Sequence, residues 1–296
     1  MVVSCQGREL VSGDKDCKCG TLYVVATPIG NLEDITLRAV RILGQVDLIA
    51  AEDTRHTRKL LSHLSISKPL ISYYKDRELS RSEKIIEALL GGRDVALVSD
   101  AGTPAISDPG AILVSHCHEK SITVIAVPGP SALTAALSVA GLTLPSFTFL
   151  GFLPGKKSQR MKTLSAHVQD EPAVVFYESP RRVCNTLAEC REVFGERKVF
   201  IARELTKIHE ELLTGTLSEV LGVLEEKSQI KGEFVVILFP DQTAQSAAPE
   251  DVEELLCWYK DNSGLSMKDS VQKIARDLNL SRSLVYEKAL YVWAKK

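Results

Sequence analysis

The sequence has no excess of basic residues. Its 36 lysines and arginines stand against 38 aspartates and glutamates, which gives a formal net charge of −2. Proteins that bind nucleic acid usually carry a basic surplus, so this balance argues mildly against RNA as a partner. Any RNA contact must therefore come from local basic clusters. The chain has 296 residues, of which 45% are hydrophobic and 25% charged, as is typical of a globular protein. This length is sufficient for two domains with hydrophobic cores and a small additional unit.

Cysteine pairs and long apolar runs are also missing. The seven cysteines include no CxxC pair, which is typical of reduced thiols in a cytosolic protein. Residues 121–155 carry no charge, but prolines and glycines interrupt them before they reach the length of a membrane span. Residues 1–19 lack the apolar core of a secretory signal. We expect a soluble, cytoplasmic protein without membrane contact.

Several catalytic signatures are absent as well. No GxGxxG or GxxxxGK[ST] follows a predicted strand, so neither a classical dinucleotide fold nor a P-loop ATPase is indicated. No HExxH and no GxSxG is present, and no residues have the spacing of metal ligands, so we expect no metal site.

The sequence does contain short apolar runs that recur in a regular pattern. Each run is followed by a loop rich in glycine and proline and then by a helical pattern, which predicts α/β architecture with a mostly parallel sheet. The runs of the first set are 21–26, 46–51, 95–99 and 122–127, and those of the second set are 147–151, 173–177, 198–202 and 234–239. We therefore predict two α/β lobes, 20–142 and 143–240, behind a disordered leader at 1–19.

The end of the chain differs from these lobes. Residues 241–250 read as a linker, and residues 251–296 carry a helical pattern. A break at 279–281, with Ser281 as N-cap, predicts a small helix-turn-helix-like unit. From Lys268 onward the tail has more basic than acidic residues, which a solvated helix face explains as well as an RNA contact does.

The loops after the first-lobe strands predict a ligand crevice. Segments 27–31, 100–104, 107–110 and 128–132 are rich in glycine and proline, and ligands of open α/β sheets bind outside the carboxyl ends of the strands. Ser131 opens a helix whose free N–H groups suit a carboxylate. Asp100 sits at a strand end, where it is either a ligand contact or a turn-stabilising residue.

Six segments resemble the tetrapyrrole methylase-like superfamily, and in particular its RNA-methylating branch. They are ATPIGNLEDIT (26–36), AEDTRHTRKLL (51–61), SDAGTPAISDPG (99–110), VPGPSA (127–132), YESPRR (177–182) and ARELTKIHEE (202–211). The resemblance runs from about residue 20 to residue 240. The chain has TPIGNLED where tetrapyrrole methylases have a GxGxGD-type loop, and SDAGTP where they have GGDP. Both departures point to the RNA branch.

The resemblance implies an S-adenosylmethionine-dependent methyltransferase of the class III type, which binds its cofactor between two lobes. The residues that match cofactor-binding positions are Pro28, Asp100, Ala101, Gly102, Ile106, Ser131, Ala132, Tyr177, Leu205 and Gly232. The implied acceptor is the 2′-hydroxyl of one cytidine ribose in 16S ribosomal RNA of the 30S subunit. The resemblance also implies a homodimer.

Transfer to a ribose hydroxyl needs a group that accepts the hydroxyl proton. Candidates at loop ends are Glu52, Asp53, His56, Glu178 and His209. We assign Asp53 and Glu178 to catalysis, with the neighbouring cations Arg55 and Arg203. Asp53 is also a good N-cap for a helix that begins at Thr54, and that alternative stays open.

Contact with RNA requires cations, and these gather in short clusters at predicted loop ends. We assign eight residues to RNA binding, namely Arg58, Lys59, Lys156, Lys157, Arg160, Arg181, Arg182 and Lys207. Two other functions remain open: methylation of a tetrapyrrole or another small molecule, and a non-enzymatic nucleic-acid-binding role of the tail.

Overall fold

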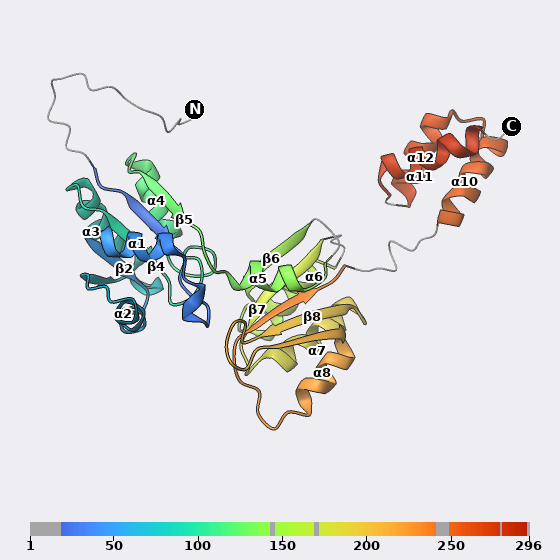
Figure 1. Ribbon diagram of the computed structural model, residues 1–296. Coiled ribbons are helices and arrows are strands. Elements are labelled where there is room, and N and C mark those ends of the chain that lie inside the picture. Colours follow the sequence, from blue (N-terminus) through green and yellow to red (C-terminus); the bar gives the residue numbers. More distant parts are fainter. Residues whose placement is uncertain (1–18, 143–145, 169–171, 241–248, 279, 295–296) are drawn as a thin grey trace, which may run out of the picture. The chain divides into compact units, whose positions relative to one another are not determined.

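The computed structural model describes residues 19–142, 146–168, 172–240, 249–278 and 280–294 (Figure 1). The chain divides into a unit that ends at Phe239 and a C-terminal unit that begins at Pro240. Nearly all of the predicted leader and most of the predicted linker lie outside the described residues.

A five-stranded parallel sheet forms the first lobe of the N-terminal unit. Its strands are β1 (Leu22–Val25), β2 (Leu48–Ala51), β3 (Leu70–Ser72), β4 (Val95–Val98) and β5 (Val124–Val127), in the spatial order β3-β2-β4-β1-β5. The parallel α/β prediction for this lobe is confirmed. The sequence did not predict β3, because this edge strand is three residues long and none of them is fully buried.

Helices cover both faces of this sheet. Val95 and Leu97 pack under α3 (Glu78–Leu90) and α4 (Ala111–Glu119), whereas Ala96 and Val98 pack under α1 (Leu37–Gln45) and α2 (Thr54–His63). Short 3₁₀ helices, η1 (Leu32–Asp34) and η2 (Lys75–Arg77), complete the lobe. Burial on both faces explains why the strands read as continuous apolar runs.

A second five-stranded sheet has a mixed pattern. Its strands are β6 (Phe147–Phe152), β7 (Ala173–Glu178), β8 (Lys198–Arg203), β9 (Glu211–Thr216) and β10 (Phe234–Leu238), in the order β6-β7-β10-β8-β9. Only the pair of β6 and β7 is parallel. The sequence did not predict β9, whose side chains alternate between exposed and half-buried positions.

Helices also cover both faces of the second sheet. The helices α6 (Lys157–Ser165), α7 (Val183–Phe194) and α8 (Leu217–Glu225) pack on one face, and α5 (Ala132–Val139) packs on the other through Ala136. The predicted lobe boundary at residue 142 assigned α5 to the first lobe. Its buried residue, Ala136, instead joins the core of the second sheet.

The C-terminal unit contains α10 (Pro249–Asn262), α11 (Met267–Asp277) and α12 (Arg282–Ala294). They share a small core that includes Leu256, Ile274 and Val285. The Ser281 hydroxyl accepts a hydrogen bond from the Leu284 N–H at 3.3 Å, which confirms the predicted N-cap. In the described part of the chain, no helix is both long and apolar enough to cross a membrane.

The start of α8 offers a direct stability test. Thr216 Oγ1 accepts from the Glu219 N–H at 3.3 Å, and the Glu219 carboxylate accepts from the Thr216 N–H at 2.8 Å, which completes a capping box. We expect Thr216→Ala to lower the free energy of unfolding by about 1 kcal/mol in urea titrations. Thr216→Ser keeps the hydroxyl and should remain near wild type. Equal losses in both variants would contradict a role for the cap.

Candidate active site

A cavity of about 240 Å³ lies in the N-terminal unit, where loops after β2, β4 and β5 meet residues of the second sheet. Eight of the ten predicted cofactor residues line it: Asp100, Ala101, Gly102, Ile106, Ser131, Ala132, Tyr177 and Leu205. Pro28 and Gly232 do not line the cavity, although their neighbours Ile29 and Glu233 do. Sequence motifs far apart in the chain thus converge on one site.

Hydrogen bonds tie the first-lobe loops into one rim. Thr27 and Gly102 exchange two backbone hydrogen bonds, of 2.9 Å and 3.0 Å. Thr103 Oγ1 donates to the Pro130 carbonyl at 3.2 Å, which joins the loop after β4 to the loop after β5. Gly102 adopts a left-handed backbone with φ +81°, a conformation that strains residues with a side chain. The glycine therefore allows the loop after β4 to turn beside the cavity.

Three carboxylates stand on the first-lobe side of the cavity. Glu52 directly follows β2, and Asp100 and Asp108 belong to the loop after β4. Asp100 Oδ1 accepts from the Asp53 N–H at 3.0 Å. Burial raises the pKa of Glu52, and the charges of Asp108 and Asp100 raise it further. Burial likewise raises the pKa of Asp108. The charges of Asp100 and Asp108 on this wall favour a ligand with positive charge.

Aromatic side chains form part of the opposite wall. The Tyr177 hydroxyl accepts from the Leu133 N–H at 3.1 Å, near the start of α5. The rings of Phe149 and Phe152 meet Tyr177 edge to face, with centroids 5.0 Å and 5.5 Å away. Phe152 lines the cavity although 57% of it is exposed. Phe152 was not predicted as a site residue, because it ends an ordinary apolar strand.

A tight contact joins the two lobes beside the cavity. The Asn31 N–H donates to Thr206 Oγ1 at 3.1 Å, and both Glu204 and Thr206 have left-handed backbones, with φ 52° and 64°. Lys207 pairs with Glu204 at 2.8 Å and with Glu233 at 3.0 Å. Lys207, predicted to bind RNA, therefore lines the cavity with its ammonium held by two carboxylates.

The residues assigned to catalysis occupy different surroundings. Asp53 caps α2 by accepting from the Arg55 N–H at 2.8 Å, and its ion pair with the Arg55 guanidinium lowers its pKa to about 2. Arg203 lies outside the cavity lining and pairs with Glu211 at 2.9 Å. Asp53 and Arg55 therefore form an ion pair next to Glu52 in the chain but outside the cavity lining, while Arg203 supports the second sheet.

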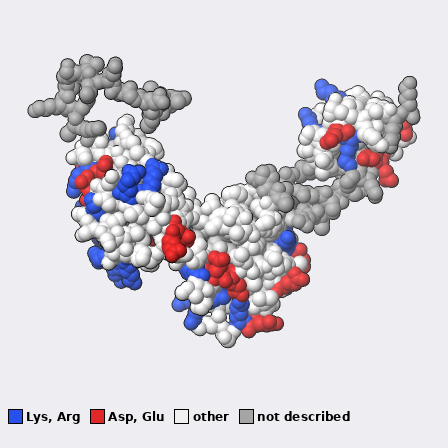
Figure 2. Space-filling model, in the orientation of Figure 1, with Lys and Arg blue, Asp and Glu red and all other residues white. Residues whose placement is uncertain are grey.

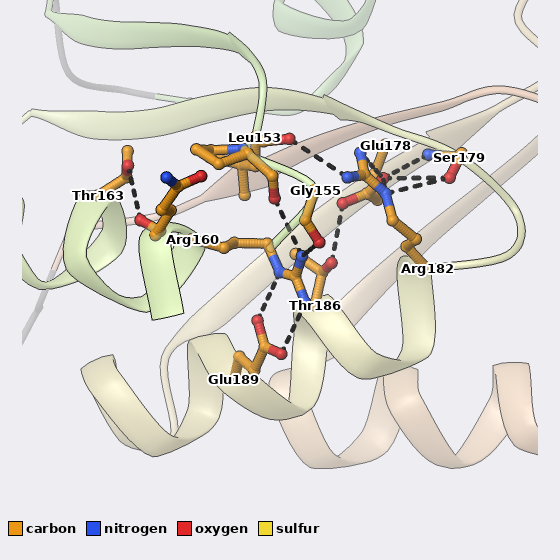
Figure 3. A network of polar contacts seen from close by, with 11 residues as sticks. Leu153, Gly155, Arg160, Thr163, Glu178, Ser179, Arg182, Thr186 and Glu189 are labelled. Atoms are coloured by element: carbon orange, nitrogen blue, oxygen red, sulfur yellow. Dashed lines mark hydrogen bonds and ion pairs between the residues drawn. The ribbon is translucent and has the colours of Figure 1, made fainter. Parts of the chain in front are cut away.

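Glu178 is enclosed in a network of polar contacts, shown in Figure 3. Its carboxylate accepts from the Ser179 N–H at 2.6 Å and from Thr186 Oγ1 at 2.8 Å, and it pairs with Arg182 at 2.7 Å. Its side chain is fully buried. With these contacts made, the geometry argues against Glu178 as a proton acceptor and favours a structural role.

Some of the residues assigned to RNA binding are exposed to solvent, and others are paired with a carboxylate. Arg160 is buried and pairs with Glu189 at 2.6 Å, so the expectation that it binds a phosphate is corrected. Arg182 is held by Glu178. The exposed ones are Arg58, Lys59, Lys156, Lys157 and Arg181. Figure 2 shows patches of both signs on the N-terminal unit and no continuous basic face on this side.

Comparison with known proteins places this site in a family. The family described as Tetrapyrrole (Corrin/Porphyrin) Methylases matches residues 21–221. A protein of Halalkalibacterium halodurans named "Ribosomal RNA small subunit methyltransferase I" is 42% identical over 90% of this chain and 93% of its own. Proteins of the same name from Synechocystis and Thermotoga maritima are 43% and 48% identical, over 92% and 74% of this chain and 98% of their own lengths.

Solved structures share the fold at low sequence identity. Cobalt precorrin-4 methyltransferase, a cobalamin biosynthetic enzyme, aligns with a TM-score of 0.56 at 17% identity, over 73% of this chain and 94% of its own. Diphthine synthase aligns with a TM-score of 0.60 at 12% identity, over 74% and 90%. The chain is a methyltransferase that belongs to the tetrapyrrole methylase family, together with the proteins named ribosomal RNA small subunit methyltransferase I.

Proposed function

We propose that this protein transfers a methyl group from S-adenosylmethionine to the 2′-hydroxyl of a cytidine ribose in 16S ribosomal RNA of the small subunit. The observation that carries the proposal is the cavity at the strand ends, which gathers eight of the residues that match cofactor positions of this family. The names of the relatives that cover most of the chain support ribosomal RNA as the acceptor.

The residues present fit the proposed cofactor. S-adenosylmethionine supplies an electrophilic methyl group on a positively charged sulfonium. The carboxylates of Asp100 and Asp108 suit its positive charges, and the apolar side chains of Ile106, Leu205 and Val235 suit its adenine ring. The bend at Gly102 lets backbone groups approach a ligand closely.

Exposed cations support the RNA part of the proposal. Arg58 and Lys59 lie on α2, which begins two residues after Glu52 of the cavity. Lys156 and Arg181 are exposed in the loops after β6 and β7, and Lys157 is exposed at the start of α6. Such side chains bind phosphates and leave the chemistry to the cavity. A homodimer and action on the assembled 30S subunit belong to the same proposal.

The decisive experiment supplies radiolabelled S-adenosylmethionine and unmodified 30S subunits, and maps the label after nuclease digestion. We expect one 2′-O-methylcytidine. The double variant Arg58→Ala, Lys59→Ala should weaken RNA binding. It should also reduce the slope of log affinity against log salt concentration by the contribution of about two phosphate contacts. The control Lys120→Ala, at the exposed end of α4, should change neither quantity. Cofactor binding without label in RNA, but with label in a small-molecule acceptor, would overturn the proposal.

A further inference from the structure

Glu52 is the carboxylate of the cavity that the fold uses least. Of the other cavity acids, Glu178 pairs with Arg182 and Glu233 with Lys207. Asp100 accepts a hydrogen bond from the Asp53 N–H at 3.0 Å, and Asp108 has a side-chain hydrogen bond with Ser99. Among the described residues, no ion pair includes Glu52. Within the part of the chain that the structure describes, Glu52 accepts one hydrogen bond, from the Asp100 N–H to Oε2, and at 3.5 Å it is at the limit of such contacts.

The surroundings of Glu52 suit proton transfer. Three acidic groups face it, namely Asp108 and Asp100 from the loop after β4 and its neighbour Asp53. Partial burial raises its pKa first, and the charges of Asp108 and Asp100 add to the effect. A carboxylate with a raised pKa is a stronger base than an exposed one.

The position of Glu52 also suits the acceptor. It lines the cavity and stands immediately before Asp53, the N-cap of α2, whose exposed face carries Arg58 and Lys59. An RNA strand held by these cations would present a ribose to the rim of the cavity at Glu52. Asp108 lies farther into the loop, where its charge also acts on Tyr177 of the second sheet.

We propose that Glu52 is the general base, whose carboxylate accepts the proton of the ribose 2′-hydroxyl as that oxygen bonds to the methyl carbon. This inference rests on the proposed function. The oxygen supplies the electron pair of the new bond, and the electron pair of the broken carbon–sulfur bond stays on sulfur, which becomes a neutral thioether. Protonated Glu52 returns its proton to water when the product leaves. Asp108, which also suits the positive charge of the cofactor, increases the basicity of Glu52 through its own charge.

The test compares Glu52→Gln with Glu83→Gln, a matched change at an exposed site on α3. In single-turnover transfer to 30S subunits, Glu52→Gln should slow the reaction by about 10²–10⁴-fold. Calorimetry should show S-adenosylmethionine affinity within about threefold of wild type, since a general base acts on the acceptor. Normal affinity also shows that the variant is folded. Glu83→Gln should match wild type in both measurements.

The pH profile separates a base from a merely structural residue. The transfer rate should fall as pH drops through the pKa of Glu52, because the protonated carboxyl accepts no proton. Asp108→Asn removes a negative charge close to Glu52 and so lowers the pKa of Glu52. The fall in rate on the acidic side of the profile, called the acidic limb, should therefore move to lower pH. If Glu52→Gln transfers methyl groups at the wild-type rate, or if Asp108→Asn leaves the limb in place, the assignment of Glu52 is overturned and the proposed function stands. If wild type labels no RNA, the proposed function itself fails.

Discussion

Replacing Arg160 by alanine is expected to lower the free energy of unfolding by about 3–5 kcal/mol, a large fraction of the stability of a typical domain. The Arg160 guanidinium meets both oxygens of Glu189, at 2.6 Å and 2.8 Å, and both side chains are about 6% exposed. Alanine would leave the Glu189 carboxylate buried without a cation. The loss is large because a buried charge without a partner costs far more than the pair contributes.

Arg160 also fixes a loop. Its guanidinium donates to the carbonyls of Pro154 and Gly155, at 3.0 Å each, and Arg182 donates to the Leu153 carbonyl at 3.3 Å (Figure 3). These carbonyls belong to the loop between β6 and α6, which follows Phe152 of the cavity wall. We therefore expect Arg160→Ala to weaken cofactor binding as well as stability.

Urea unfolding followed by circular dichroism measures this prediction. Arg191→Ala is the control on α7, because its ion pair with Glu196 spans 3.9 Å and both partners are about half exposed. Such surface pairs contribute about 0–1 kcal/mol. The double variant Arg160→Met, Glu189→Met should recover most of the stability, since it leaves no unpaired charge. A single-variant loss as small as that of Arg191→Ala would refute the role of the buried pair.

Arg160 also shows why the sequence predicted the architecture but not the role of every charged residue. Apolar runs and glycine- and proline-rich loops report burial and chain reversal, which are local properties, so the first sheet and its ligand-binding loops were predictable. A basic cluster does not reveal whether an arginine faces water or a buried acid 29 positions away, and Arg160 does the latter. The partner of a charge is a tertiary property.

The pairing direction of the second sheet and the edge strands β3 and β9 were not predicted from the sequence, for similar reasons. The second sheet is mostly antiparallel, yet β7, β8 and β10 are apolar on both faces and read like the strands of the first. The choice of neighbour, not the composition, sets their direction. Asp108 could have been noticed in SDPG after β4. The contributions of Phe152 and Val235 required the three-dimensional arrangement.

Gly30→Ala is expected to weaken S-adenosylmethionine binding by about 10–100-fold, because the added methyl group has no room between the lobes. A Cβ at Gly30 would lie 2.4 Å from Lys207 Cγ, 2.8 Å from the Leu205 carbonyl oxygen and 2.9 Å from Thr206 Oγ1. The lysine side chain can move aside, but the Leu205 carbonyl is backbone. The loops must separate, and Ile29 and Leu205, which line the cavity from either lobe, must separate with them.

Two variants isolate this effect in calorimetric titrations of S-adenosylmethionine. Gly44→Ala, at a helical position of α1 with no atom within 4 Å of the new Cβ, should leave affinity unchanged and raise stability by about 0.5–1 kcal/mol. Thr206→Val removes the acceptor of the Asn31 hydrogen bond without adding bulk, so its loss of affinity should stay below about tenfold. If Gly30→Ala binds as tightly as Gly44→Ala, the cavity does not depend on close approach of these two loops. If Gly30→Ala and Thr206→Val lose affinity equally, the hydrogen bond rather than the spacing of the lobes sets the site.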